Sequence, residues 1–261
     1  TRNSMTDVVV ATGTVEPVTK VDVGTQVSGI IDRIYVDYNS VVKKGQLIAE
    51  MDKVTLQAEL ESQEAQLANA KAEYEYQQKN YARSKVLFEK QLISDSDYEE
   101  ATYNYEKAKS TYEKSKADIV KVRRNLGYAV ITSPIDGVVI SREVEEGQTV
   151  AAGFETPTLF TIAKDLTEMQ VIADVDEADI GEIREGQRVT FTVDAYRNDA
   201  FEGVVTQVRL EATVESNVVT YEVVISAPNP DLKLKPRLTA NVTIYTDTRE
   251  NVLTVPNKAL R

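Results

Sequence analysis

Residues that commonly perform chemistry are scarce in this sequence of 261 residues, which contains no cysteine and no histidine. The chain therefore lacks disulfides, thiolate ligands and the commonest general base and metal ligand. Three carboxylates, Asp174, Asp176 and Asp179, have a spacing like that of a calcium loop. An EF-hand loop needs glycine at its sixth position, and Asp179 occupies that position here. We therefore predict no catalytic residue, no cofactor and no metal site.

The charge distribution argues against a nucleic-acid partner. The formal net charge is −12 and the isoelectric point is about 4.7, whereas nucleic-acid binding needs a basic surface. The segment 53–126 holds as many basic as acidic residues, so the excess of acid lies entirely outside it. We therefore expect that segment to meet a partner without long-range attraction by its net charge.

Large residues recur at every seventh position in both halves of the segment 53–126. They are Leu60, Leu67, Tyr74, Tyr81 and Phe88 in the first half, and Tyr98, Tyr105, Tyr112, Ile119 and Leu126 in the second. The smaller residues Ala101, Ala108, Ser115 and Val122 lie between those of the second set. Such a heptad repeat keeps one side of a helix against a partner helix. We therefore expect two long helices, the first over 54–91, folded into an antiparallel hairpin.

The segments before and after this hairpin, 20–52 and 127–164, alternate like short β-strands and share two motifs. The motif GII at 29–31 matches GVV at 137–139, and VKKGQ at 42–46 matches VEEGQ at 144–148. Each segment has too few strands to bury a core alone. We therefore predict that 20–52 and 127–164 pack together as one small β-sandwich, interrupted by the hairpin 53–126.

Residues 165–247 read as a separate β-barrel domain. Four stretches alternate at period two, at 190–196, 204–210, 221–225 and 239–245, and one short helix is expected at 177–184 with Asp176 as its N-cap. Short apolar segments at 8–15 and 251–256 could pair with each other. We therefore assign 1–19 together with 248–261 to a partial terminal β domain, membrane-proximal in the family resemblance given below.

The residues around Lys53 resemble the biotinyl/lipoyl fold, whose hairpin tip carries a modified lysine. The matching residues are Glu50-Met51-Asp52-Lys53. In lipoyl domains the chain turns straight back into a strand after the lysine, whereas a long helix is expected to begin here. The resemblance implies, as an alternative function, a carrier component of an enzyme with acyl transfer at Lys53. We favour a solvated lysine in the first helical turn, with Asp52 as N-cap.

Taken as a whole, the chain resembles the periplasmic adaptors, or membrane fusion proteins, of tripartite efflux pumps. The stretches that resemble HlyD/MacA-type adaptors are VDVGTQVSG at 21–29, SPIDG at 133–137, GQTV at 147–150, EADI at 177–180 with GQ at 186–187, and VLTVP at 252–256. The chain departs from the family at Arg237, which stands where the family has glycine or an acid. We expect the barrel turn there to differ.

The resemblance implies an elongated, modular α+β protein in which a lipoyl-like domain carries a long helical hairpin. It implies a non-enzymatic adaptor that links an inner-membrane ABC transporter to a TolC-like outer-membrane channel. It further implies a hexameric ring in the periplasm, anchored to the inner membrane through a segment that precedes Thr1, with loop 151–158 facing the ring axis. An RND-pump adaptor and a Gram-positive ABC-transporter adaptor are alternatives.

The family also carries an Arg, Leu and Ser motif at the hairpin tip, which this chain matches at Arg83, Leu87 and Ser94. Adaptors of this type dock the outer-membrane channel through the tip. Arg83 offers a planar multi-donor group, Leu87 lies one turn further along, and Ser94 with Asp97 forms a capping signal. The alternative roles are a solvated Arg83, packing of Leu87 in the helix seam, and Ser94 as a cap only.

Overall fold

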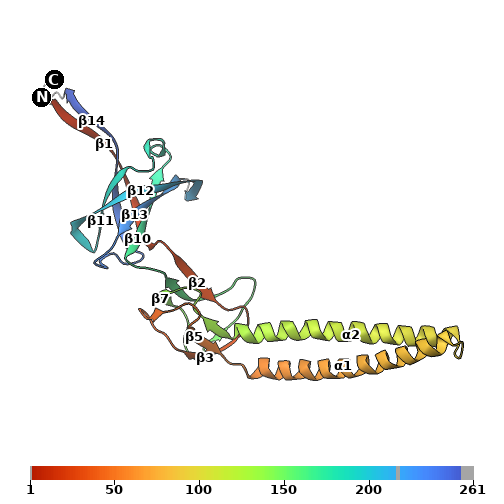
Figure 1. Ribbon diagram of the computed structural model, residues 1–261. Helices are drawn as coiled ribbons and strands as arrows, with labels where there is room; N and C mark the ends of the chain where they lie inside the picture. Colours follow the sequence, from red (N-terminus) through yellow and green to blue (C-terminus); the bar gives the residue numbers. More distant parts are fainter. Residues whose placement is uncertain (1, 216–217, 254–261) are drawn as a thin grey trace.

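The computed structural model describes residues 2–215 and 218–253. It shows a β-barrel, a β-sandwich and a long helical hairpin that follow one another in space (Figure 1). This arrangement confirms the predicted α+β modular architecture. Among the described residues, no helix has the length and apolar character needed to cross a membrane.

The hairpin consists of α1 (Val54–Glu89) and α2 (Asp95–Tyr128), which run antiparallel and project from the sandwich as a rod (Figure 1). The first helix ends two residues before the predicted Gln91. Aromatic rings from the two helices stack along the seam, from Phe88 to Tyr98, Tyr81, Tyr105, Tyr74 and Tyr112, with successive centroids 4.4 to 6.0 Å apart. The heptad repeat thus predicted which side chains would meet.

Small residues of α2 make this stacking possible. Ala101 and Ala108 are buried within the seam, between the aromatic positions, and Val122 is buried nearer its base. The hydroxyls of Tyr81 and Tyr98 lie 3.3 Å apart, within hydrogen-bond distance. Stacked aromatic pairs stabilise a structure by about 0.5–1.5 kcal/mol beyond the effect of area burial, so five consecutive pairs hold the two helices together as a stiff rod.

The sandwich is built from strands on both sides of the hairpin in the sequence. Its strands are β2 (Lys20–Gly24), β3 (Gly29–Ile34), β4 (Val41–Val42), β5 (Leu47–Met51), β6 (Val130–Thr132), β7 (Gly137–Arg142), β8 (Thr149–Val150) and β9 (Thr158–Ala163). One sheet has the order β2-β9-β7-β4 and the other β6-β5-β3-β8. Each sheet therefore takes two strands from before the hairpin and two from after it, which confirms that the two segments form one core.

The base of the hairpin is fixed by the pairing of β5 with β6. Glu50 pairs with Val130, and the Met51 backbone N–H donates to the Ala129 carbonyl at 2.8 Å. Helix α1 begins three residues after Met51, and α2 ends just before Val130. Leu56 and Tyr128, one from each helix, pack against the sandwich core.

Three tight turns share a glycine followed by a glutamine, and all three glycines have φ between +82° and +88°. These turns are centred on Gly45-Gln46, Gly147-Gln148 and Gly186-Gln187. In each turn the glutamine Oε1 accepts from a backbone N–H three residues earlier, at 2.9 to 3.0 Å, on Lys43, Glu145 and Arg184. Because a positive φ strains other residues, the repeated GQ pair marks one turn geometry used three times.

The barrel is closed by six antiparallel strands in the order β1-β10-β13-β12-β11-β14. They are β1 (Arg2–Pro17), β10 (Glu168–Asp176), β11 (Arg188–Val193), β12 (Tyr196–Glu215), β13 (Val218–Pro228) and β14 (Thr239–Leu253). The largest side chains in its core include Phe191, Met169, Ile225 and Ile244, all at most 2% exposed.

The assignment of residues 1–19 to a separate terminal domain was wrong for the segment 8–15. Gly13 in β1 pairs with Ala173 of β10 and with Ala240 of β14, so this strand belongs to the barrel and closes it. The strand alternates buried Val9 with exposed Val10, as a barrel strand must. Beyond the barrel, β1 and β14 continue as a two-stranded ribbon (Figure 1). Residues 254–261 of the predicted terminal domain lie outside the described part of the chain.

Two local expectations also differ from the structure. The predicted helix at 177–184 is a 3₁₀ turn, Ile180–Glu182, and its N-cap is Asp179 in place of Asp176. Gly181 lies in its middle, and a helical glycine costs about 1 kcal/mol relative to alanine. At the hairpin base the N-cap position of α1 is Lys53, although the Asp52 carboxylate still accepts from the Val54 N–H at 2.8 Å.

The loop between β13 and β14 is held by a buried asparagine. Asn229 is only 3% exposed. Its side-chain amide donates to the carbonyls of Leu166 and Leu234 and accepts from the Leu234 N–H, with all three distances at or below 2.9 Å. Further along the loop, the Arg237 backbone N–H donates to the Val15 carbonyl at 2.8 Å. Arg237 has a positive φ of 69°. The backbone of Arg237, at the position where the family has glycine or an acid, therefore adopts the left-handed conformation.

We predict that Arg237→Gly raises the thermal midpoint of the barrel transition. A non-glycine residue in the left-handed region destabilises the fold by roughly 1–2 kcal/mol, and glycine removes this strain. The greater conformational entropy of glycine in the unfolded chain offsets about 0.4–1 kcal/mol of that gain. Differential scanning calorimetry measures the shift. The control Arg237→Ala keeps the strain while removing the guanidinium, so it should give no gain. A gain with alanine equal to that with glycine would show that the side chain, and not the backbone, is responsible.

We also predict that the hairpin loses stability at alkaline pH. The hydrogen bond between the Tyr81 and Tyr98 hydroxyls raises the pKa of Tyr81 above its ordinary value, because the neutral Tyr81 hydroxyl can donate its proton to Tyr98. Because the folded state holds this proton more tightly, the stabilisation is complete below the unfolded tyrosine pKa of about 10 and is lost as the pH rises from there through the higher pKa of the folded state. Circular dichroism at 222 nm during thermal melts measures the effect. Tyr81→Phe should show a weaker pH dependence, and an unchanged dependence would contradict the assignment.

Candidate functional site

The far end of the hairpin is a short turn between α1 and α2. The N–H groups of Lys90, Gln91 and Leu92 donate back to the carbonyls of the last turn of α1, at 2.9 to 3.2 Å. Gln91 adopts a positive φ of 57°, which lets the chain reverse. The turn is therefore a compact cap on the rod, and it presents its side chains to solvent.

Ser94 begins the second helix through a complete capping box. Its hydroxyl accepts from the Asp97 N–H at 3.1 Å, and the Asp97 carboxylate accepts from the Ser94 N–H at 3.4 Å. The predicted capping role is confirmed. Because the cap uses only the acceptor capacity of the hydroxyl, its proton remains able to donate to a partner.

Leu87 and Arg83 both lie outside the helix seam. The seam position at this level belongs to Phe88, whose ring stacks on Tyr98, while Leu87 is 39% exposed. Leu87 therefore lies beside the seam position of Phe88, with part of its side chain open to solvent. Arg83 is exposed, and among the described residues it makes no hydrogen bond and no ion pair. Its guanidinium is thus available to a partner.

Two further apolar side chains at this end escaped the sequence analysis. Leu92 is 66% exposed in the turn, and Val86 is 49% exposed in the last two turns of α1. The Leu92 N–H donates to the Leu87 carbonyl at 2.9 Å, which places these two leucines at the same end of the rod. The available signal was an apolar residue inside a predicted turn, where polar residues are usual.

Lys53, the alternative chemical site, lies between β5 and α1 and not at the tip of a β-hairpin. Its ammonium donates to Glu50 Oε1 at 2.9 Å, and Glu50 Oε2 accepts from the Tyr35 hydroxyl at 2.8 Å. The Lys53 ammonium and then the Tyr35 hydroxyl lower the pKa of Glu50, and the same carboxylate raises the pKa of Tyr35. Lys53 is therefore a paired, partly buried residue, which differs from the solvated lysine that we expected.

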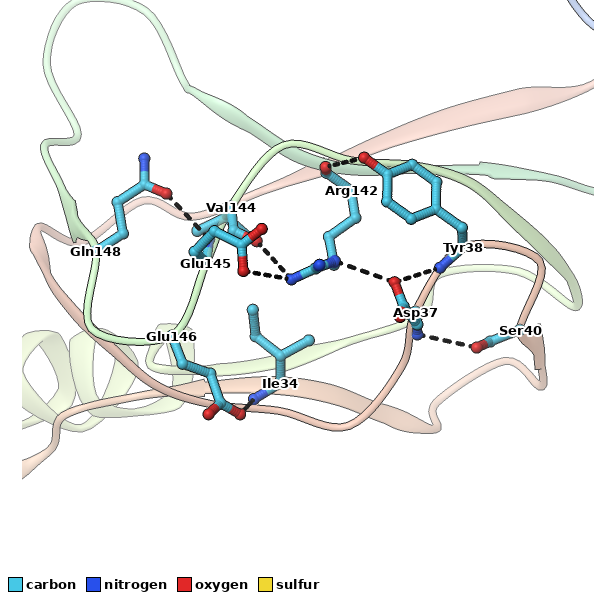
Figure 2. Close-up of polar contacts among 9 residues, drawn as sticks. All are labelled: Ile34, Asp37, Tyr38, Ser40, Arg142, Val144, Glu145, Glu146 and Gln148. Carbon is cyan, nitrogen blue, oxygen red and sulfur yellow. Dashed lines mark hydrogen bonds and ion pairs between the residues drawn. The ribbon is translucent and has the colours of Figure 1, made fainter.

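A polar network in the sandwich centres on Arg142 (Figure 2). Its Nε lies 3.2 Å from Asp37, its Nη1 donates to Glu145 at 2.9 Å and to the Val144 carbonyl at 3.2 Å, and its guanidinium lies over the Tyr38 ring. The partners come from both sequence halves of the sandwich. Because these contacts are internal, the network ties the two halves together.

The acidic residues of the calcium-like spacing do not gather around a point. Asp174 and Asp176 lie on β10, and Asp179 precedes the 3₁₀ turn. Within residues 2–215 and 218–253, the structure contains no group of three or more acidic side chains placed to hold a metal ion. The end of the hairpin, with its exposed apolar side chains, is thus the candidate site for contact with a partner.

Comparison with known families and proteins agrees with this architecture. A family described as the RND membrane fusion protein barrel-sandwich hybrid domain matches residues 19–162, and a CusB-like β-barrel domain matches residues 171–248. The chain is 32% identical over 266 aligned residues to the macrolide export protein MacA of Yersinia pestis, covering 97% of this chain and 71% of the relative.

Two other relatives extend the comparison. The pyoverdine export membrane fusion protein PvdR of Pseudomonas putida is 35% identical and aligns with 100% of this chain and 75% of its own length. The crystal structure of MacA from Actinobacillus actinomycetemcomitans is 33% identical with a TM-score of 0.80, covering 100% of this chain and 85% of that one. The chain belongs to the membrane fusion protein family, the periplasmic adaptors of tripartite efflux pumps.

Proposed function

We propose that this chain is the adaptor that joins an inner-membrane ABC transporter to a TolC-like outer-membrane channel for export of drugs, other small molecules or peptides. The observation that carries the proposal is an exposed tip at the end of a stiff rod, where Leu87 is 39% exposed and the Arg83 side chain makes no hydrogen bond or ion pair with the described residues. Helix α1 has 36 residues, so the rod is roughly 54 Å long at 1.5 Å per residue. That length lets the tip act far from the β domains.

The export role is supported by the names of the relatives, which describe macrolide export and pyoverdine export. The likeness of the sequence motifs to MacA-type adaptors favours the ABC class of transporter. An adaptor for an RND pump is the second candidate, since the matching family description refers to RND membrane fusion proteins. In both cases the chain itself performs no chemistry, and the transporter supplies the energy.

We further propose a hexameric ring in the periplasm, held at the inner membrane by an anchor that precedes Thr1. A ring presents several tips to one channel at once. Weak contacts at each tip then add through multivalency, because each bound tip raises the effective concentration of the next. Modest chemistry per tip is therefore sufficient for a stable junction.

The tip residues have distinct roles in this proposal. Arg83 donates its planar fork to backbone carbonyls or carboxylates of the channel. Leu87 and Leu92 supply apolar area, and the hydroxyl of Ser94 donates one further hydrogen bond while it caps α2. The specificity then depends on contact geometry, since the hairpin has no net charge to attract a partner from a distance.

We predict that Arg83→Lys impairs export nearly as much as Arg83→Ala. Lysine keeps the charge but loses the planar fork, and the loss of one charge-assisted hydrogen bond costs about 1.5–3 kcal/mol per site. Leu87→Asp should be at least as damaging, because it places an unpaired charge in an apolar contact. The measurement is drug susceptibility of a strain that lacks its own adaptor and expresses each variant.

Lys79→Ala is the matched control, since Lys79 is an exposed cation of the same helix and lies about one turn further from the tip. It should export like the parent protein. Circular dichroism should show parental helicity for all variants, because none of the residues is buried. Parental resistance from the combined Arg83→Ala and Leu87→Asp variant would reject docking through this tip.

A further inference from the structure

A cleft of about 700 Å³ lies at the junction of the sandwich and the barrel. The sandwich lines it with residues of β2, β7 and β9, and the barrel lines it with the end of β1 and the β13–β14 loop. Ligand pockets typically have volumes of about 300–1,000 Å³ and often lie between domains. The size and place of this cleft are therefore those of a small-molecule site.

Charges of opposite sign line the two walls of the cleft. The sandwich wall carries the carboxylates of Asp22 and Glu143, and the barrel wall carries the cations of Lys235 and Arg237. Lys20 and Glu16, which also line the cleft, form a salt bridge at 3.5 Å, so their two charges cancel. The cleft thus has an acidic side and a basic side.

These four charges are not neutralised inside the described part of the chain. Asp22 accepts from the Thr161 hydroxyl at 2.8 Å, and Glu143 accepts from the Ser141 hydroxyl at 3.2 Å, so each carboxylate keeps acceptor capacity. No hydrogen bond or ion pair occupies the side chains of Lys235 and Arg237 within residues 2–215 and 218–253. Both walls can therefore bind charged groups of a ligand.

Apolar side chains complete the lining. Ile140 of β7 and Leu166, which lies between β9 and β10, are half-buried in the cleft, and Leu232 is 54% exposed at its barrel side. Leu232 therefore adds exposed apolar surface to the charged lining of the cleft. The middle of a ligand can thus lie on apolar surface while its two ends reach the charges.

The basic wall is held in place before any ligand arrives. The Asn229 side chain fixes the β13–β14 loop through three hydrogen bonds, and the Arg237 backbone donates to Val15 of β1. A rigid loop loses little conformational freedom on binding, which favours affinity.

We propose that this cleft binds a small amphipathic zwitterion. Its anionic end lies against Lys235 and Arg237, its cationic end lies against Asp22 and Glu143, and its apolar middle covers Leu166 and Leu232. A molecule with a single charge would form ion pairs with one wall only and leave the charges of the other wall without a counter-charge.

The test uses the tripeptide Leu-Ala-Leu with free termini as the zwitterionic probe. N-acetyl-Leu-Ala-Leu keeps only the carboxylate, and Leu-Ala-Leu amide keeps only the ammonium. Isothermal titration calorimetry on the full chain near pH 7 should give the highest affinity for the zwitterion. Methyl-labelled NMR spectra should show shifts at Ile140 and Leu166 on its addition.

The variants separate the two walls. Arg237→Gln should weaken binding of the zwitterion about tenfold, as expected for one lost charge-assisted contact, and should not change binding of the amide. Glu143→Gln should weaken binding of the amide and not of the acetylated peptide. Lys79→Gln, which removes an exposed cation from the distant hairpin, should leave all three affinities unchanged.

Three results would overturn the proposal. These are no measurable binding of Leu-Ala-Leu, equal affinity for all three peptides, and methyl shifts confined to residues outside the cleft. If a variant lost its fold, its circular dichroism would show it, and the comparison of the three peptides on the parent chain would still decide the matter.

Discussion

The pairing of β5 with β6 is the interaction on which the proposed docking end of this molecule depends. It joins the last strand before the hairpin to the first strand after it, through Glu50 opposite Val130 and the bond from Met51 to Ala129. This pairing sets the two helix bases side by side, so the helices can run antiparallel from their first turn. The interleaved sheets around β5 and β6 then turn a large insertion into a rigid extension of the sandwich.

The stacked aromatic seam carries this geometry out to the tip. Because Phe88 and Tyr98 occupy the last seam level, the neighbouring Leu87 is forced to the outside. The same regularity leaves Arg83, one turn earlier, exposed to solvent. The proposed docking surface is thus a consequence of how the rod packs, and the capping box at Ser94 leaves the serine hydroxyl proton able to donate.

Local and periodic features could be read from the sequence, whereas long-range ones could not. The heptads predicted the hairpin, and the motifs shared by 42–46 and 144–148 predicted that the two flanking segments form one sandwich. The role of β1 was missed because its partners β10 and β14 lie more than 150 residues away, and strand periodicity does not reveal a partner. The pairing of Lys53 with Glu50 is local, but it depends on the bend between β5 and α1, which the residue pattern does not specify.

The most direct test of the account is photo-crosslinking in cells with a benzophenone amino acid placed at Leu87 or at Val120. Both positions are exposed, at 39% and 57%, but Val120 lies near the base of α2. We predict a covalent adduct between the adaptor and the outer-membrane channel from position 87 and none from position 120. An adduct with the channel from position 120 alone, or none from position 87 at normal adaptor abundance, would contradict docking through the tip.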